Sequence, residues 1–377
     1  MKIKRYIETR ITRSLKSKNP KIVVIYGARQ VGKTTLVESI LQNSAWRIMR
    51  INGDILSLSD QALFASHDLD YILDRLSGYD VLFIDEAQKI HNSGTYLKII
   101  YDHHPSLKII VTGSSTLDLA SRIKEPLTGR TDTYQLYPIA YTELSQHPCC
   151  TVQPSLYNRL VYGLYPTLFS IDEVDDQKKF LINIATDYLY KDVLNMTAME
   201  DSYKIKDLLR LLAFQIGSAV SFSELGQKLG LSVKTVSHYI DLLEASFVIF
   251  TVRGFRKNLR NEVNRKPKVY FIDLGIRNAI IENFNTIESR DDVGALWENF
   301  LISERRKRNA YQNHFCSSYF WQTKTGAELD YIESYGGKLC GYEFKWRKVS
   351  KAPKAWADTY DASFDCINQD NFLPFIT

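Results

Sequence analysis

Short apolar runs separated by segments of helical periodicity occupy the first 150 residues. The runs are continuous and rich in β-branched residues, which is typical of strands that are buried on both faces of a parallel sheet. They span Ile22–Ile25, Val81–Ile84 and Lys108–Val111, with a further strand expected at Arg47–Asn52. Helical spacing of apolar residues predicts helices at residues 2–18 and 69–76. This alternation predicts an α/β domain built on a parallel sheet.

The middle of the chain has a different pattern. Residues 151–202 show only helical periodicity, which predicts a helical lid. After a helix at Ile205–Ala213, the segments Phe222–Leu229 and Val233–Leu243 form a pair of expected helices separated by Gly230. Helix, short glycine turn and helix is the helix-turn-helix pattern. Strands expected at residues 247–252 and 269–272 would add a β-ribbon and make this region a winged helix.

The C-terminal pattern predicts a second α/β region. A long helix is expected at Gly294–Arg308, followed by a strand at Tyr319–Gln322. A hairpin should follow, with strands at Gly326–Ile332 and Gly341–Trp346 and with Gly337 in its turn.

The first strand leads directly into a motif that fits G-x-x-x-x-G-K-[ST], and a helix is expected from Thr35 onward. Strand, glycine loop and helix are the context that this Walker A motif, or P-loop, requires. Its glycines allow successive N–H groups to turn toward phosphate oxygens, Lys33 would reach the β and γ phosphates, and Thr34 would ligate Mg²⁺. The alternative is a tight turn that only resembles a P-loop. The predicted ATP-binding residues are Gly27, Ala28, Arg29, Gln30, Val31, Gly32, Lys33, Thr34 and Thr35.

Two carboxylates end the strand at Val81–Ile84, in the position of a Walker B motif. They would lie at the carboxyl edge of the sheet, where α/β proteins bind ligands. Asp85 is predicted to hold Mg²⁺ through its water shell, and Glu86 to orient and deprotonate the attacking water. Such a base suits an ATPase and would waste ATP in a small-molecule kinase.

Two further residues are candidates for the catalytic set, together with Lys33 and Glu86. Ser114 follows the strand at Lys108–Val111 and would sense the γ-phosphate; the alternative is an N-cap of the next helix. Arg130 is a candidate arginine finger, acting in cis or from a neighbouring subunit. A solvated surface arginine is the alternative.

The helix-turn-helix region is a candidate DNA-binding element. In such elements the N-terminal half of the second helix enters the major groove, and the ribbon loop here is strongly basic, so it would neutralise several phosphates. The alternative is a winged helix that only packs domains together. The predicted DNA-binding residues are Lys234, Thr235, Ser237, His238, Arg256 and Lys257.

The C-terminal region contains a candidate nuclease site. Asp330 and Glu343-x-Lys345 lie on neighbouring expected strands and fit D…(D/E)-x-K, with Glu298 on the preceding helix. The carboxylates would share Mg²⁺, and the lysine would activate water or neutralise a phosphorane. A surface hairpin of alternating charge is the alternative, although the apolar neighbours of these residues favour a site.

Composition fits these predictions without adding to them. The 377 residues are 45% hydrophobic and 24% charged, with a formal net charge of +5, which is ordinary for a globular protein of two or three domains. The five cysteines form neither a CxxC pair nor a metal-binding spacing, as in reduced cytoplasmic proteins. We expect neither a signal peptide nor a membrane span.

Nearly the whole chain resembles the bacterial and archaeal AAA+-like ATPases whose ATPase domain is followed by a DUF4143 domain. The matching segments include GARQVGKTTL, VLFIDEAQKI, LGLSVKTVSHYIDLLE, GAELDYI and YEFKW. The resemblance implies an AAA+-like P-loop domain at 1–150, a helical lid at 151–202, a winged helix at 203–280 and a PD-(D/E)XK nuclease-like, restriction-endonuclease-like fold at 281–377.

We therefore expect a Mg²⁺-dependent ATP-hydrolysing enzyme whose nucleotide state controls a winged-helix and nuclease-like module acting on DNA. One alternative is an ATP-driven switch for a protein partner, in which the nuclease fold is not catalytic. Another is a sequence-specific DNA-binding regulator. Assembly into a homo-oligomer is compatible with each of them.

Overall fold

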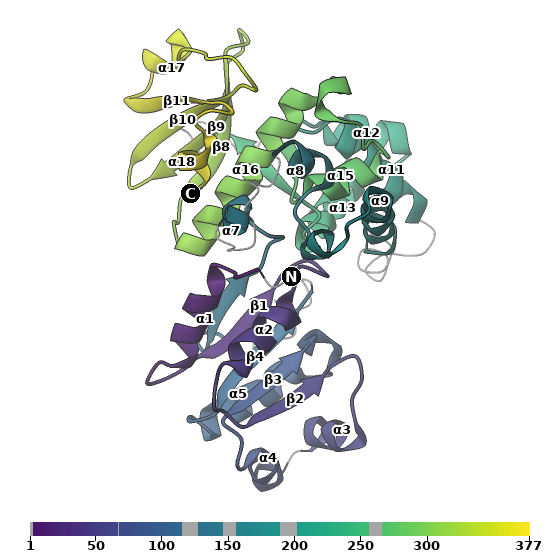
Figure 1. The fold of residues 1–377 in the computed structure, drawn as a ribbon, viewed down its shortest axis with the longest axis vertical. Coiled ribbons are helices and arrows are strands. Elements are labelled where there is room, and N and C mark those ends of the chain that lie inside the picture. Colours follow the sequence, from purple (N-terminus) through teal and green to yellow (C-terminus); the bar gives the residue numbers. More distant parts are fainter. Residues whose placement is uncertain (1–2, 67, 115–126, 146–155, 189–201, 256–265) are drawn as a thin grey trace. The chain divides into compact units, whose positions relative to one another are not determined.

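The structure is a computed structural model that describes residues 3–66, 68–114, 127–145, 156–188, 202–255 and 266–377 (Figure 1). The chain divides into two compact units, Lys2–Tyr137 and Pro138–Thr377. Among the described helices, none combines the length and the apolar content needed to cross a membrane.

The N-terminal unit is a five-stranded sheet with the order β2-β3-β4-β1-β5, and every pairing in it is parallel. The predicted parallel α/β domain is therefore confirmed. Its strands are β1 (Ile22–Tyr26), β2 (Ile48–Asn52), β3 (Val81–Asp85), β4 (Lys108–Gly113) and β5 (Thr131–Gln135). Its helices are α1 (Ile7–Leu15), α2 (Lys33–Gln42), α3 (Leu58–Ala65), α4 (Leu69–Leu76), η1 (Ala87–Lys89) and α5 (Ser93–His103).

Both faces of this sheet are buried, which explains the continuous apolar runs in the sequence. Alternate residues of β1, β3 and β4 pack with α3, α4 and α5 in one hydrophobic core. The intervening residues, such as Val23 and Phe83, are also buried, and α1 and α2 lie against β1 and β4. The rigid central strands therefore place the ends of β1, β3 and β4 side by side.

The C-terminal unit begins with helices and ends with a mixed sheet. Its helices are α7 (Tyr141–Ser145), α8 (Leu156–Tyr162), η3 (Pro166–Ser170), α9 (Val174–Asn183), η4 (Ile184–Tyr188), α11 (Ser202–Phe214), α12 (Phe222–Leu229), α13 (Val233–Ala245), α15 (Leu274–Ile280), η6 (Ile287–Ser289), α16 (Val293–Gln312), α17 (Lys354–Ala357) and α18 (Phe372–Ile376). Its strands are β6 (Ile249–Gly254), β7 (Lys268–Phe271), β8 (Ser317–Gln322), β9 (Glu328–Tyr335), β10 (Lys338–Phe344) and β11 (Ala362–Ile367).

The six strands form one sheet with the order β11-β10-β9-β8-β6-β7. The β6–β7 ribbon, which we expected to belong to a separate winged helix, is joined to β8 through Arg253 and Gly254. The long helix α16 packs against β7 and β10 of this sheet and against α18. Side chains of the ribbon can therefore reach the residues of the C-terminal hairpin.

The helix-turn-helix segment forms as the sequence predicts. Gly230 ends α12 in a left-handed conformation with φ of +63°, and Ser232 caps α13 by accepting a hydrogen bond from the backbone N–H of Thr235. The turn is close, because a Cβ on Gly226 would lie 2.6 Å from the carbonyl oxygen of Leu231. The predicted strands after α13 are also present, as β6 and β7.

Candidate functional site

The P-loop begins where β1 meets its neighbours. Gly27 follows β1 and donates a backbone hydrogen bond to Gly113 of β4. A Cβ at this position would lie 2.1 Å from the carbonyl oxygen of Leu136, so only glycine fits. Gly32 begins α2 with φ of +92°, a left-handed conformation that also favours glycine. The two motif glycines therefore meet different physical demands.

Lys33 lies inside the loop rather than in solvent. Its side chain is 5% exposed, and its Nζ donates hydrogen bonds of 3.0 Å to the carbonyl oxygens of Gly27 and Ala28. The same Nζ is 3.8 Å from Oε1 of Glu86. The loop thus holds a cation at the N-terminus of a ten-residue helix, where an anion is favoured.

The oxygen atoms of Thr34 and Asp85, which could bind a metal ion, lie next to each other. The Thr34 hydroxyl donates a 2.8 Å hydrogen bond to Oδ2 of Asp85, and Thr112 of β4 donates to its other carboxylate oxygen. A hydroxyl beside a carboxylate is the donor set that Mg²⁺ prefers. The structure therefore brings the predicted magnesium residues together.

Glu86 is held in a defined position. Its backbone lies in the left-handed region with φ of +50°, which is uncommon for a residue with a side chain and is characteristic of functional sites. The backbone N–H of Glu86 donates to the Thr112 hydroxyl at 3.0 Å. Its Oε2 accepts a 2.5 Å hydrogen bond from Nε2 of Gln88, which also donates to the Ser114 hydroxyl. The base and the sensor candidate are therefore linked through one buried amide.

Sequence reasoning missed Gln88 and Thr112. Their only signal is proximity, since Gln88 follows Glu86 by two residues and Thr112 precedes Ser114 by two. Neither position belongs to the glycine-loop pattern or to the carboxylate pair. Contacts across β3 and β4 were needed to find them.

Arg130 lies at the amino-terminal end of the strands, whereas the P-loop lies at their carboxyl-terminal end. Its carbonyl oxygen accepts from the N–H of Ile22, the first residue of β1, whereas the P-loop follows the last residue of that strand. The length of β1, about 16 Å, therefore separates Arg130 from the loop, and its guanidinium forms hydrogen bonds of 2.8 and 3.0 Å with Asp102. The structure therefore does not bring Arg130 to the loop of its own chain, and its role as an arginine finger stays a prediction.

The C-terminal carboxylates also come together, in what we call the acidic cluster: Glu298, Asp330 and Glu343. Oδ2 of Asp330 on β9 accepts a 2.8 Å hydrogen bond from the N–H of Phe344, next to Glu343 on β10. Burial, followed by the charges of Glu298 and Glu343, raises the pKa of Asp330 to about 8. Lys345 lies 2.6 Å from Oε1 of Glu343. All four predicted residues thus belong to one neighbourhood.

Two ribbon residues complete this neighbourhood, and the sequence did not indicate them. Lys268 and Tyr270 of β7 both donate to Oε1 of Glu298, at 3.0 and 2.5 Å. They were missed because the ribbon was assigned to a different domain from the hairpin. The structure places both on a strand against α16.

The DNA-binding candidates are only partly described. Lys234 and His238 are exposed on α13, whereas Thr235 and Ser237 are half-buried. The Thr235 hydroxyl lies 2.8 Å from that of Ser232 in the helix cap, so it already has a structural partner. Arg256 and Lys257 lie outside the described residues.

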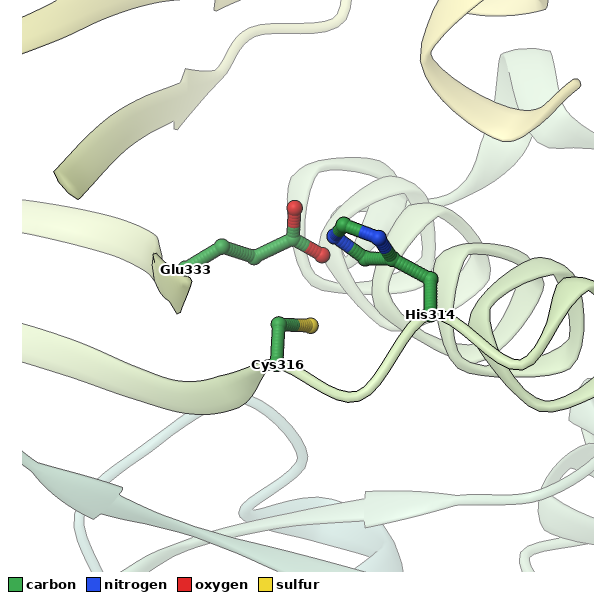
Figure 2. Close-up of side chains that lie close together, drawn as sticks. All are labelled: His314, Cys316 and Glu333. Carbon is green, nitrogen blue, oxygen red and sulfur yellow. The ribbon is translucent and has the colours of Figure 1, made fainter. Parts of the chain in front are cut away.

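A third group of polar side chains lies near the C-terminal end of α16. Figure 2 shows His314, Cys316 and Glu333 pointing toward one another, with ligand atoms within 4.8 Å. The carboxylate of Glu333 already accepts two hydrogen bonds from the Arg305 guanidinium, at 2.9 and 2.6 Å. Burial and Glu333 raise the pKa of the Cys316 thiol to about 11, which disfavours a thiolate ligand. We interpret this group as a structural polar network.

Three family models match successive parts of the chain. Family models match an AAA domain at residues 19–145, a domain of unknown function (DUF8612) at 153–286 and another (DUF4143) at 293–363. The uncharacterized proteins MJ1544 and MJ1637 of Methanocaldococcus jannaschii are each 23% identical, over 83% and 88% of this chain and 72% and 74% of their own lengths.

Solved structures resemble the chain more distantly. AMPPCP-bound DnaA from Aquifex aeolicus has a TM-score of 0.33 and 13% identity, covering 63% of this chain and 86% of its own. The RuvB Holliday junction branch migration motor of Thermotoga maritima has a TM-score of 0.30 and 19% identity, covering 64% and 86%. Such low scores carry no functional argument. The chain therefore carries an AAA domain at residues 19–145, whose parallel sheet has the P-loop after β1, and a DUF4143 domain at residues 293–363.

Proposed function

We propose that the N-terminal unit binds ATP with Mg²⁺ and hydrolyses it. The observation that supports this most is the arrangement around Lys33, a buried cation in a glycine loop with Asp85 and Glu86 on the next strand but one. On binding, the Lys33 ammonium would exchange its two carbonyl acceptors for phosphate oxygens, which are stronger partners. Thr34 and Asp85 would hold the metal, whose chemistry is to neutralise charge on the phosphates.

Glu86 would act as the general base in this proposal. Gln88 and the Thr112 hydroxyl hold it near the P-loop, and its side chain is 22% exposed, so water can reach it. A carboxylate held in this way can accept a proton from water as the water attacks. Ser114 would report the γ-phosphate through Gln88, which contacts both residues.

Substituting Glu86→Gln separates binding from turnover. We expect kcat to fall by about 100- to 10,000-fold, the usual contribution of general base catalysis, with ATP binding retained. Phosphate release and the affinity for a fluorescent ATP analogue measure the two properties on the full chain. Glu288→Gln is the matched control, because Glu288 is exposed and lies in the other unit. Unchanged turnover in Glu86→Gln would contradict the assignment.

The finer proposal is that the nucleotide state controls the C-terminal unit and that this unit acts on DNA. It is supported by the exposed basic residues of α13 after a tight helix-turn-helix, in a region that we propose to be a winged helix. Binding to DNA duplexes of several sequences, with and without ATP, tests it. Phosphate-mediated binding should weaken steeply with salt, whereas a sequence-specific regulator would keep its preference. A response to ATP without DNA binding would favour the protein-partner switch.

The acidic cluster favours a second candidate function, nuclease-like chemistry on DNA. Among the described residues, nothing donates a hydrogen bond to Oε2 of Glu343, although this residue is buried. A buried carboxylate oxygen in that state suits a metal ion or water. Mg²⁺- or Mn²⁺-dependent cleavage of a plasmid, lost in Asp330→Ala, is the expected result. Intact plasmid under all metals would favour a non-catalytic scaffold.

A further inference from the structure

Lys268 lies among the carboxylates of the acidic cluster. Its Nζ is 3.0 Å from Oε1 of Glu298 and 4.0 Å from Oδ1 of Asp330. Its side chain is only 10% exposed, and the ammonium lies 5.5 Å from the centre of the Phe320 ring. An ammonium group beside the Glu298 carboxylate and close to the carboxyl group of Asp330 interacts strongly with both, because it is buried from water.

Contacts on either side hold this lysine in place. Asn299 of α16 makes two hydrogen bonds with the backbone of Phe271, at 2.7 and 2.8 Å, which fixes the helix against β7. Glu298 is therefore presented to Lys268 and also accepts from the Tyr270 hydroxyl. The position of the ammonium follows from the docking of strand and helix rather than from a mobile side chain.

The Lys268 ammonium occupies the position that a metal ion would take between Glu298 and Asp330. The acidic residues here are the three of the acidic cluster, and Glu328 is close enough to interact with them. Lys268 and Lys345 supply the opposite charge. The ammonium of Lys345 lies beside Glu343, whereas that of Lys268 lies beside the other two carboxylates. Oε2 of Glu343 is left without a hydrogen bond from the described residues.

We propose that Lys268 is an internal cation of the acidic cluster, so that a divalent ion enters only by displacing its ammonium group from Glu298 and Asp330. The proposal rests on the second candidate function, because it concerns the same carboxylates. Occupancy by a divalent ion is then conditional: the ion must compete with a charge that is already bound. Oε2 of Glu343 is the ligand atom that remains open while Lys268 is in place.

Mn²⁺ binding to the full chain tests this proposal. The experiment uses an Asp85→Asn background, which removes the metal ligand at the P-loop, and measures free Mn²⁺ by electron paramagnetic resonance without nucleotide. We expect Lys268→Met to bind Mn²⁺ at least about tenfold more tightly, since the competing charge is lost. Lys268→Arg keeps the charge and should bind as weakly as the parent. Lys266→Met is the control for an exposed lysine two residues away.

The gain must depend on the carboxylates, so adding Asp330→Asn to Lys268→Met should abolish it. Equal affinity in Lys268→Met and the parent would overturn the proposal. A second measurement needs no variant at Lys268: Mg²⁺ should increase acetylation of Lys268, measured by mass spectrometry, while Lys266 is unaffected. Constant acetylation of Lys268 would also overturn it. Neither readout requires cleavage or ATP hydrolysis, so loss of the proposed function would be seen separately.

Discussion

The P-loop and the acidic cluster both combine lysine with carboxylates, yet they hold the lysine differently. Lys33 rests on two neutral carbonyl oxygens of its own loop, and Glu86 is 3.8 Å away. Lys268 is bound directly to the carboxylate of Glu298 and lies close to that of Asp330. The first lysine can exchange weak partners for an anionic ligand, whereas the second is already neutralised. The P-loop is therefore a site whose cation is available to a ligand, whereas in the acidic cluster the charge of the lysine is already offset by a carboxylate.

The largest effect should follow from removing the P-loop cation. We expect Lys33→Ala to lower ATP affinity by about 1,000-fold, because charge-assisted bonds to phosphate are the strongest contacts of such a loop. Titration with a fluorescent ATP analogue measures it. Lys89→Ala, at an exposed lysine on the same unit, should leave affinity unchanged. Equal affinity in Lys33→Ala would remove the basis of the comparison.

The acidic cluster depends on a tertiary contact between α16 and β7. Asn299→Ala would leave the buried N–H and C=O of Phe271 without their side-chain partner, at a cost of about 2–3 kcal/mol. Urea unfolding followed by tryptophan fluorescence suits this test, since Trp297, Trp321, Trp346 and Trp356 all lie in Pro138–Thr377. The exposed Asn285 provides the control variant, Asn285→Ala, which should unfold like the parent.

How much could be predicted from the sequence differs between the two sites for the same reason. The P-loop residues are contiguous, and Asp85 and Glu86 end an apolar strand, so local pattern sufficed. The acidic cluster draws on α16, β9 and β10, and Lys268 and Tyr270 approach it from β7. The sequence indicated Glu298 and the hairpin residues but not the two residues of β7. In the sequence, Lys268 looks like one more basic residue of the ribbon. Only the pairing of β6 with β8 shows that the ribbon belongs to the same sheet as the hairpin.

The strands that sequence analysis missed are both at sheet edges. β5, with the sequence TDTYQ, and β11, with ASFDCI, are only partly buried, so neither shows a continuous apolar run. Their pairing comes from the neighbouring strands β1 and β10, which are specified much more strongly. Polar edge strands follow from tertiary context and not from their own composition.

Because the pKa of Asp330 is raised, the free energy of unfolding should depend on pH. The pKa of Asp330 is raised to about 8 in the folded chain, chiefly by burial, against about 3.9 when unfolded. The folded state then keeps a proton that the unfolded state has lost, so this group's contribution to stability falls as pH rises toward 8. Asp330→Asn removes that dependence.

We therefore expect Asp330→Asn to gain stability relative to the parent by up to about 1.4 kcal/mol for each pH unit between about pH 5 and about pH 8. Urea midpoints across this range measure the difference. Asp361→Asn, at an exposed carboxylate, is the control and should follow the parent. A constant difference between Asp330→Asn and the parent would show that the cluster is not balanced by a proton on Asp330.

The smallest effect tests whether the P-loop base is positioned by its neighbours. Gln88 is 4% exposed and connects Glu86 with Ser114, so it is a positioning residue rather than a catalytic one. Gln88→Leu should lower kcat by about tenfold while ATP affinity is retained, because a misplaced base loses part of its contribution. A merely structural role would instead lower the urea midpoint and leave kcat per folded molecule intact. Restoration by Gln88→Glu is not expected, since a carboxylate there would repel Glu86.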